Sequence, residues 1–401
     1  VEVEIAEHRF RCQDVLGRGS YSEVWRAEVL AGTSGLTEVA LKEVRCQSQA
    51  ELQQAIFEVQ VLLALERSAE PGTVLRVPRC IAYKVEPCQQ GGWKVRTAMT
   101  VVPGDALDCF TRRPAPPGQT VTAAARLGCA LSVKLMLDIG PMLQELAPIA
   151  WHRDVNSHNI LVDGIPEDAT PEEVLQRASF WLIDFGLAVD AQSWVTEHGK
   201  WRTEYIGGDS RYWPPSSWMM HLLGPEGFEG RPDLCEQYQW RLDVHGLGIT
   251  AVELLCTVML AAPGADQERL TARAQLLDAW LRYRDNVWRW WSAVFKVFSS
   301  GGDIAPVQAQ LVQERIIDQL EELLANIRLA LRSCAAQEDP STGCVLTTIA
   351  DMIDERVHFK LEDLRGRLQQ ALPQSWRTSV APAPDGTRSP PAGSPPPVHF
   401  H

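Results

Sequence analysis

Three polar side chains in this sequence lie next to apolar runs, at points where chemistry could take place. Asp184 follows the apolar run of FWLIDFGLAVD, with Gly186 close behind it, and Asp154 and Asn159 lie five residues apart in WHRDVNSHNILVDG. A carboxylate at the end of a buried strand, beside a flexible glycine, suits a ligand of a divalent cation, because such cations prefer oxygen donors. A purely structural turn at Asp184 would show the same pattern.

A lysine and a glutamate earlier in the chain form a second candidate group. Lys42 ends the strand-like VALK, and Glu58 lies among apolar neighbours in the helical stretch AIFEVQVLL. A charge near the buried edge of a helix requires a partner, and Lys42 is the natural one. The alternative is a solvated glutamate on an exposed helix face.

A glycine-containing turn precedes this lysine. VLGRGSYSEVW places Gly17 and Gly19 between two apolar runs. Such a turn can hold phosphate with its backbone N–H groups, but G-x-G alone is a weak signal because most glycines in such places only make turns.

The elements that must position these residues divide the chain into three parts. Residues 1–102 read as short β-rich runs with one helical interruption, AELQQAIFEVQVLLALERS, and predict a small β-rich lobe. Helical patterns dominate from the end of the loop RRPAPPGQT to about residue 372, and we predict a larger helical lobe over residues 103–372, so the fold class is α+β with a two-lobed arrangement. Residues 373–401 are so rich in Pro, Ser and Gly that we predict a disordered tail.

Charge and composition exclude several classes of partner. The chain has 38 Lys and Arg against 51 Asp and Glu, a net charge of −13, which disfavours nucleic acid and anionic lipid. It has no continuous apolar run long enough for a membrane span and no secretion signal at its start, so we expect an intracellular, cytoplasmic protein. The ten scattered cysteines favour reduced thiols over a disulfide framework or a zinc site.

Taken together, the motifs resemble those of the eukaryotic protein kinase family over about residues 10–350. The resemblance is carried by the glycine-containing turn, the lysine of VALK, the helical glutamate, HRD with an asparagine five residues past its aspartate, and DFG. It implies a two-lobed kinase fold and transfer of the γ-phosphoryl group of Mg-ATP to a protein substrate. Serine and threonine hydroxyls are the expected acceptors.

The resemblance also implies roles for individual residues. Lys42 would hold the α- and β-phosphates of ATP and pair with Glu58. Asp154 would accept the proton of the substrate hydroxyl, and Asn159 and Asp184 would bind Mg²⁺. Further residues expected in the ATP site are Leu16, Gly17, Arg18, Gly19, Ser20, Tyr21, Ser22, Val24, Ala40, Met99 as gatekeeper, Thr100 and Val102 in the hinge, and Leu161. Several of these would also be ordinary core residues.

A buried aspartate should support the loop that carries Asp154. RLDVHGLGITAVELL resembles the central helix of the large lobe, in which Asp243 would accept hydrogen bonds from the backbone of this loop.

Some positions depart from the family pattern. Asn156 stands where serine/threonine kinases have a lysine that reaches the γ-phosphate, and Asp209 replaces the threonine beside it. We therefore hypothesise a slow kinase in which Asp209 hydrogen-bonds Asn156, with Arg211 or Lys200 as substitute cation. The alternative for Asp209 is a simple turn cap.

A second departure concerns a buried ion pair of the family. Ser216 replaces its glutamate, and Gly343 stands where its arginine is expected. Losing both partners costs little, whereas losing one would strand a buried charge. The paired loss favours an altered lobe that still folds.

The segment after Asp184 has two interpretations. Arg153 beside Asp154 favours control by phosphorylation of Ser193, Thr196 or Thr203. Alternatively, the nearby tryptophans order this segment without modification. They are Trp194, Trp201, Trp213 and Trp218.

A tryptophan-rich stretch, DNVWRWWSAVFKVF, also allows two interpretations. Helical spacing predicts a buried face, and aromatic residues equally suit a docking surface at 287–298. The residues of the expected buried face are Val287, Trp291, Val294 and Phe298, with Trp288 and Trp290 on other faces. For the whole protein, a pseudokinase that binds nucleotide or acts as a scaffold, and a small-molecule kinase, remain as alternatives to a protein kinase.

Overall fold

The structure is a computed structural model. It describes residues 1–372 except 20, 21, 33, 34, 70–73, 90, 114–118, 167, 197, 198, 205 and 263–270. Ser20, Tyr21 and the expected tail at 373–401 therefore lie outside the described residues. The compact unit Val1–Ala371 contains all the elements considered below.

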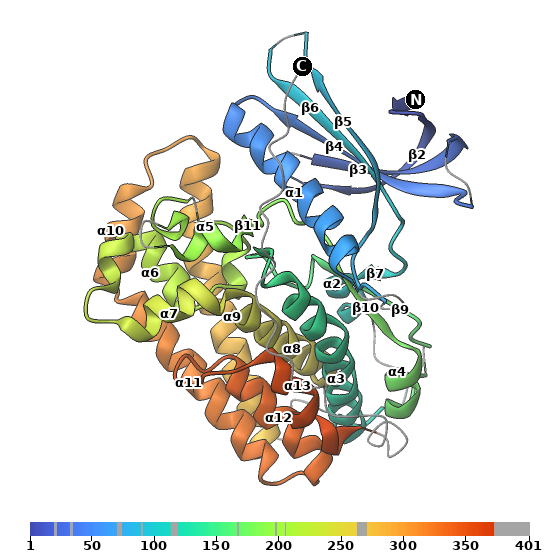
Figure 1. Cartoon of the computed structure of the whole chain (residues 1–401). Helices are drawn as coiled ribbons and strands as arrows, with labels where there is room; N and C mark the ends of the chain where they lie inside the picture. Colours follow the sequence, from blue (N-terminus) through green and yellow to red (C-terminus); the bar gives the residue numbers. More distant parts are fainter. Residues whose placement is uncertain are drawn as a thin grey trace. The chain divides into compact units, whose positions relative to one another are not determined.

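A six-stranded antiparallel sheet forms the N-terminal part (Figure 1). Its strands, in spatial order, are β1 (Glu2–Ile5), β2 (His8–Arg18), β3 (Ser22–Ala31), β4 (Glu38–Cys46), β6 (Trp93–Met99) and β5 (Cys80–Pro87). Val39 and Leu41 of β4 pack into a core cluster with Phe10. Because successive strand residues point to opposite faces, Ala40 and Lys42 point to the other face of the sheet.

One long helix packs against this sheet. Helix α1 (Gln49–Ser68) begins at Ser48, whose side chain accepts a hydrogen bond from the Glu51 N–H at 3.2 Å. Leu52 and Ala55 pack in a cluster with Val95 of β6. Glu58 lies one turn further on and is also buried, so the helix turns a carboxylate toward the protein interior.

The C-terminal part is mostly helical, as the sequence predicts. Its longer helices are α3 (Val121–Leu146), α8 (Leu242–Ala261), α9 (Ala272–Ser299), α11 (Ile316–Ala335) and α12 (Pro340–Met352). The shorter helices are α2 (Leu107–Thr111), α4 (Pro171–Arg177), α5 (Ala191–Val195), α6 (Pro215–Leu223), α7 (Pro232–Trp240), α10 (Ala305–Gln313) and α13 (Leu364–Arg367). Short 3₁₀ turns are η1 (Lys200–Arg202), η2 (Ser210–Tyr212), η3 (Pro225–Phe228), η5 (Leu361–Asp363) and η6 (Gln369–Ala371).

Short strands frame the two loops that carry the candidate residues. They are β7 (Asp105–Ala106), β8 (Ala150–Trp151), β9 (Ile160–Asp163), β10 (Ser179–Leu182) and β11 (Val189–Asp190). The loop between β8 and β9 contains Asp154, and we call 152–159 the Asp154 loop. The segment between β10 and α6 begins near Asp184, and we call 184–215 the Asp184 segment. β9 pairs with β10 and β8 with β11, both antiparallel, so the two loops start side by side.

Helix α8 is buried on nearly all sides. It is long and apolar enough in composition to cross a membrane, but 72% of the relevant window is buried inside the protein. This burial is what a core helix shows, and it explains why the helix lacks a polar face.

The cysteines agree with the expectation of reduced thiols. No disulfide joins the ten of them, all of which lie in the described part of the chain. Five are buried: Cys46, Cys80, Cys129, Cys256 and Cys334. Burial raises the pKa of the Cys80 thiol to about 11, so that thiol stays protonated at neutral pH.

Helix α9 corrects the predicted buried face of the tryptophan-rich stretch. Val287 and Val294 are buried as expected, and Trp290 completes this face. Trp291 is only partly buried, and Phe298 is 56% exposed because it lies near the end of the helix, where exposed residues surround it. The buried face therefore follows the spacing 287, 290 and 294.

The contact between α3 and α8 requires a glycine (Figure 1). A Cβ at Gly128 of α3 would lie 2.9 Å from Leu255 Cδ1 and 3.2 Å from Leu255 Cα. The missing side chain thus lets the two helices approach closely.

We predict that Gly128→Val lowers the free energy of unfolding by about 1–3 kcal/mol, because the added carbons overpack this contact. Ala123→Val, on an exposed position of α3, is the matched control and should cost less than about 1 kcal/mol. Urea melts measure both. Equal losses in the two variants would contradict the close-contact explanation.

Candidate functional site

A buried ammonium joins three elements of the fold. Lys42 Nζ of β4 lies 2.6 Å from Glu58 Oε1 of α1 and 2.8 Å from Asp184 Oδ1. Burial works against the charge on Lys42, but the two carboxylates outweigh it and raise the pKa of the ammonium. The structure therefore brings together these three candidate residues, as the sequence predicts for Lys42 and Glu58.

Asp184 keeps its charge beside this ammonium. Burial favours the neutral acid, yet Lys42 and the Gly186 N–H lower the pKa of the Asp184 carboxyl. Its backbone φ is 63°, in the left-handed region that non-glycine residues rarely adopt. Such strain costs roughly 1–3 kcal/mol and is common at functional sites, where the surrounding contacts enforce it.

Gln54 holds the start of the Asp184 segment against α1, and the sequence interpretation missed it. Gln54 Nε2 donates to the carbonyls of Gly186 at 3.0 Å and Ala188 at 2.8 Å. Gln54 lies four residues before Glu58, and residues at this spacing share a helix face. That spacing was the available signal.

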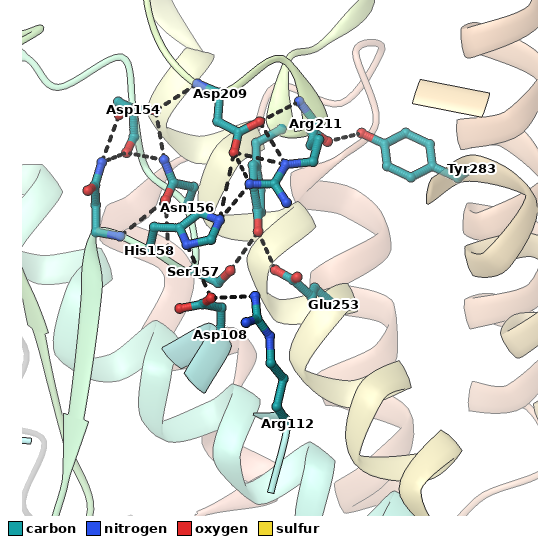
Figure 2. A network of polar contacts seen from close by, with 12 residues as sticks. Asp108, Arg112, Asp154, Asn156, Ser157, His158, Asp209, Arg211, Glu253 and Tyr283 are labelled. Atoms are coloured by element: carbon teal, nitrogen blue, oxygen red, sulfur yellow. Dashed lines mark hydrogen bonds and ion pairs between the residues drawn. The ribbon is translucent and has the colours of Figure 1, made fainter. Parts of the chain in front are cut away.

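Asp154 lies at the centre of a second polar group (Figure 2). Three N–H donors hold its carboxylate: Asn159 Nδ2 to Oδ2 at 2.7 Å, Asn156 Nδ2 to Oδ1 at 2.7 Å, and the backbone N–H of Asp209 to Oδ1 at 2.8 Å. Two donors come from the Asp154 loop itself and the third from the Asp184 segment. The carboxylate orientation is thus fixed from both loops.

Asn156 does more than orient Asp154. Its Oδ1 accepts from the backbone N–H groups of His158 at 2.8 Å and Asn159 at 3.1 Å, and its Nδ2 also donates to the Asp154 carbonyl at 3.1 Å. A lysine, which has only donors, could not accept these bonds. Asn156 therefore shapes the loop as well as the carboxylate.

The hypothesised hydrogen bond between the side chains of Asp209 and Asn156 is wrong. The Asp209 carboxylate instead binds the Arg211 guanidinium, with Nε 2.9 Å from each oxygen, and caps the turn by accepting from the Arg211 N–H at 3.0 Å. The physical reason is that a guanidinium two residues away outcompetes a neutral amide for a carboxylate. Only the backbone of Asp209 contacts Asp154.

Arg211 extends this network to α2 (Figure 2). Its Nη2 contacts His158 Nε2 at 2.5 Å, and His158 Nδ1 lies 3.2 Å from Asp108 Oδ2. Asp108 is also paired with Arg112 at 2.8 Å. Lys200, the other substitute cation considered, lies exposed in η1. Of the two, only Arg211 joins the network around Asp154.

Burial changes the acidity of Asp154. It raises the pKa of this carboxyl to about 7, with a further increase from the charges of Asp209 and Asp184, although the N–H donors work against the rise. A carboxylate near this pKa is suited to accept a proton near neutral pH. A full positive charge at residue 156 would oppose the rise in the pKa of Asp154 more strongly than the neutral amide of Asn156.

Asp243 holds the first two residues of the Asp154 loop, as predicted. Its two carboxylate oxygens accept from the backbone N–H groups of His152 at 2.8 Å and Arg153 at 2.7 Å. Arg153 has a φ of 64°, so the loop is held in a strained conformation here. The His152 ring also packs edge-on against Phe185, at 4.9 Å between centroids, which connects the two loops.

An aromatic cluster orders the Asp184 segment. Trp194 and Trp201 are buried against Phe228 and Tyr238. The Arg153 guanidinium lies over the Trp194 ring at 5.2 Å, and its Nε donates to the Leu187 carbonyl at 2.9 Å. These contacts favour the interpretation that tryptophans order the segment.

The expected phosphorylation sites lie around this cluster. Thr196 and Thr203 are exposed, and Ser193 is partly buried beside Asp190, whose side chain accepts from the Ser193 N–H at 2.8 Å. Arg153 is buried and already engaged, so its role as a counter-charge to a phosphate stays an untested prediction.

Ser216 and Gly343, which stand where the family has a buried ion pair, make other contacts in this structure. Ser216 is fully buried, and its backbone N–H donates to Gln237 Oε1 at 3.3 Å. Gly343, in the first turn of α12, leaves room for the Ala335 carbonyl, which would be 2.9 Å from an added Cβ. Both positions are thus compatible with a folded helical part.

The residues expected around ATP border β2, β3, β4 and β6. Gly17 pairs with Val24 and Val24 with Lys42 across neighbouring strands, and Ala40 pairs with Met99. Gly19 donates its N–H to the Ser22 carbonyl at 2.8 Å, and Arg18 is ion-paired with Glu23.

The other residues expected around ATP differ in exposure. Leu16 is 44% exposed, Val102 is partly buried, and Leu161 lies partly buried on β9. The Thr100 N–H is already bonded to the Arg79 carbonyl, so it is not available to a ligand.

Two glycines near the candidate residues have different surroundings. A Cβ on Gly17 would have no atom within 4 Å, and one on Gly186 would come within 3.0 Å of Asp184 Oδ1 and 3.8 Å of Lys42 Nζ. The backbone is therefore open at Gly17, whereas the missing side chain at Gly186 leaves room for Asp184 and Lys42.

The metal-binding expectation fits the oxygen donors present. Asp184 offers a charged carboxylate, and the Asn159 amide faces Asp154 through its nitrogen. Among the described residues, no group of three or more His, Cys, Asp or Glu is placed to hold a metal by itself. Mg²⁺ needs only one or two protein ligands when phosphate and water oxygens complete its coordination shell.

One comparison with known proteins, the family match, agrees with the motifs. The model of a family described as protein tyrosine and serine/threonine kinase matches residues 10–279. Among solved structures, one match is the crystal structure of BubR1 kinase domain, with 21% sequence identity, a TM-score of 0.42 and coverage of 63% of this chain. The match spans 64% of that structure's chain. A search of curated proteins found no match.

The raised pKa of Asp154 predicts a pH-dependent stability. Because this pKa lies above the value in the unfolded chain, the native state takes up a stabilising proton, and this contribution is lost as the pH rises through about 7. The free energy of unfolding of the wild type relative to Asp154→Asn should therefore rise as the pH falls from about 8 to about 5. Urea melts at several pH values measure it.

Asn156→Lys should flatten this pH dependence, because a nearby cation favours the charged carboxylate. Asp278→Asn, which removes an exposed carboxylate of α9, is the control and should track the wild type. A stability difference between wild type and Asp154→Asn that does not change with pH would contradict the assigned environment of Asp154.

Proposed function

This chain belongs to the protein tyrosine and serine/threonine kinase family, and on that premise we propose that it transfers the γ-phosphoryl group of Mg-ATP to a serine or threonine hydroxyl of a protein substrate. The observation that carries the proposal is the buried contact of Lys42 with both Glu58 and Asp184. In protein kinases the corresponding ion pair and metal-binding aspartate must both be in place for transfer. The contacts of Lys42 with Glu58 and Asp184 support the same roles for these residues.

Each residue of the site has a defined task under this proposal. Lys42, held by Glu58, binds phosphate oxygens at the inner end of the site, and Asp184 and Asn159 hold Mg²⁺. Bound Mg²⁺ supplies positive charge that offsets the charge of the transferred group. Asp154 orients the acceptor hydroxyl and accepts its proton at a carboxylate oxygen, and the donors from Asn156, Asn159 and Asp209 keep that carboxylate aimed.

The replacement of a lysine by Asn156 sets the expected rate. The family's lysine supplies charge near the transferred phosphoryl group, and a preorganised group of this kind contributes about 2.7–4 kcal/mol in comparable tests. Arg211 is committed to Asp209: burial works to lower the pKa of the Arg211 guanidinium, but the Asp209 carboxylate outweighs it and leaves that pKa raised. We therefore propose a slow kinase rather than a fast one.

A nucleotide-binding pseudokinase that serves as a scaffold is the second candidate. The observation that favours it is the same Asn156, a neutral amide in place of a catalytic cation. Against it, none of the five residues that perform transfer in the family is replaced in this chain. These are Lys42, Glu58, Asp154, Asn159 and Asp184.

The cellular setting is part of the proposal. Protein substrates of this family and its usual location favour an intracellular, cytoplasmic protein, and the net charge of −13 favours neither nucleic acid nor anionic membranes as partners.

We predict that Asp154→Asn lowers the rate of phosphoryl transfer at least about a hundredfold, because it removes the proton acceptor. Transfer from labelled ATP to a generic protein substrate, measured in single turnovers, tests this. Asp278→Asn, at an exposed ion pair of α9, is the control and should retain the wild-type rate. Wild-type turnover in Asp154→Asn would overturn the assigned mechanism.

Nucleotide binding gives a separate prediction. Mg-ATP at about one hundred times its Kd should stabilise the folded protein by about 2.7 kcal/mol, seen as a higher melting temperature. Asp184→Ala should remove most of the Mg²⁺-dependent part of this shift. A shift without turnover would identify the pseudokinase, and no shift together with no turnover would reject nucleotide binding altogether.

A further inference from the structure

The second half of α9 presents aromatic side chains on an exposed face. Trp288, Trp291, Phe295 and Phe298 are spaced three, four and three residues apart, so they line one side of the helix. Trp288 is 55%, Phe295 52% and Phe298 56% exposed, and the Trp291 and Phe295 rings are in contact at 6.1 Å. We call these four residues the α9 aromatic face.

Three of the four side chains of this face, Trp288, Phe295 and Phe298, contribute little to the packing of α9, because more than half of each is exposed. The buried side of the same helix is formed by Val287, Trp290 and Val294, which are each at most 2% exposed. Large apolar side chains grouped on a surface commonly mark a site where another molecule binds. The α9 aromatic face also lies beyond residues 10–279, the part that matches the kinase family, so the family pattern does not account for it.

The surroundings of the face carry the opposite charge to the chain as a whole. Residues 278–300 contain four cations and two acids, a net charge of 4 − 2 = +2, whereas the whole chain carries −13. Arg282 and Arg284 are ion-paired with Asp278 and Asp285, and the other two cations, Arg289 and Lys296, are exposed and form the basic rim of the face. An apolar face with a basic rim is complementary to a partner with apolar side chains and a negative charge.

The face is connected to Asp154 by direct contacts. The Arg211 guanidinium lies over the Trp288 ring at 5.7 Å from its centroid. Figure 2 shows a second contact of α9, in which the Tyr283 hydroxyl donates to the Arg211 carbonyl at 2.9 Å. Arg211 binds the Asp209 carboxylate, and the Asp209 N–H holds Asp154. A molecule that covers Trp288 therefore changes the surroundings of the residue that fixes the Asp209 turn.

A second contact follows a parallel route. Trp291 packs against Trp213 of the Asp184 segment, with ring centroids 5.9 Å apart. Trp213 in turn donates its Nε1–H to the Gly207 carbonyl at 3.0 Å. Two aromatic side chains of the face thus contact the segment that supplies a donor to Asp154.

We propose that the α9 aromatic face is a docking surface for an acidic segment of another protein that bears apolar side chains, and that its occupation alters Asp154 through Arg211. The docking part is independent of the proposed kinase activity. The coupling part rests on that activity.

Two other occupants fit the charges less well. A symmetric dimer through this face would bring the same basic rim of each copy together, and like charges repel. An anionic membrane would attract the rim but repel a chain of net charge −13. An acidic peptide segment meets only the basic rim and the rings.

The test uses the full chain and a defined probe. The probe is a fluorescein-labelled synthetic peptide with leucine and phenylalanine at i, i+3, i+4 and i+7 and glutamate elsewhere, and a matched peptide has lysine in place of glutamate. Fluorescence anisotropy should show binding of the glutamate peptide and at least about tenfold weaker binding of the lysine peptide. Added salt should weaken the binding of the glutamate peptide. Equal affinities would overturn the proposal.

Two variants locate the binding site. The double variant Trp288→Ala with Phe295→Ala should bind the glutamate peptide at least about tenfold more weakly than the wild type. Leu329→Ala, which also removes an exposed apolar side chain but lies on α11, is the control and should leave the affinity unchanged. Arg289→Glu with Lys296→Glu should reverse the preference between the two peptides. An unchanged affinity in the Trp288 and Phe295 variant would reject the face as the site.

The competing occupants are tested on the same protein. Sedimentation with phosphatidylserine-containing vesicles that depends on Trp288 and Phe295, without peptide binding, would overturn the proposal in favour of a membrane surface. Dimerisation at rising protein concentration that disappears in the same variant would overturn it in favour of a second copy.

Once peptide binding is measured, the effect of the bound peptide on Asp154 is tested through the rate of phosphoryl transfer. Saturation with the glutamate peptide should change the single-turnover rate of phosphoryl transfer at least about threefold in the wild type and leave it unchanged in Trp288→Ala with Phe295→Ala. A saturated wild type with an unchanged rate would reject the coupling. A protein that binds the peptide but shows no transfer with or without it would count against the proposed kinase activity and leave the docking result standing.

Discussion

The structure depends on one buried cation held between two carboxylates. Lys42 comes from the sheet, Glu58 from α1 and Asp184 from the loop that follows β10, so a single ammonium joins three separate elements. Removing the ammonium would leave the Glu58 carboxylate buried without its partner, and a buried charge that loses its partner destabilises the fold. The helix, the strand and the Asp184 segment are therefore constrained to one arrangement, and Gln54 strengthens it by binding two carbonyls of that segment.

The Asp154 loop is organised around hydrogen-bond acceptors. Asp243 fixes its start through two backbone N–H groups, and Asn156 fixes its end through two more. A strained Arg153 between these anchors shows that the loop is held by its contacts and not by its own preference. In this frame Asp154 receives three donors and still has a pKa of about 7, because burial outweighs them.

Ordering of the Asp184 segment relies on apolar packing more than on charge. Its own Trp194 and Trp201 are buried against Phe228 and Tyr238, and the Arg153 guanidinium lies over the Trp194 ring. Such packing is present in the chain as synthesised, whereas a phosphate must be added. Helix α9 adds to this packing, because its Trp288 ring lies under the Arg211 guanidinium and its Trp291 ring packs against Trp213.

The sequence alone determined the residue types, their order and the local elements that carry them. Strand alternation placed the side chains of Lys42 and Leu41 on opposite faces of the sheet, and helical spacing placed Glu58 on the inner side of α1. Both placements depend on short-range periodicity. The partner of Asp209, the four bonds of Asn156 and the stacking of Arg153 on Trp194 were decided only by the tertiary structure. In a loop without periodicity, side-chain directions follow from the backbone conformation, and residues 55 positions apart, such as Asp154 and Asp209, meet only after the whole helical part has packed. The shift from Trp291 to Trp290 on the buried side of α9 has the same origin, since helical spacing fits both and only the neighbouring helices select one.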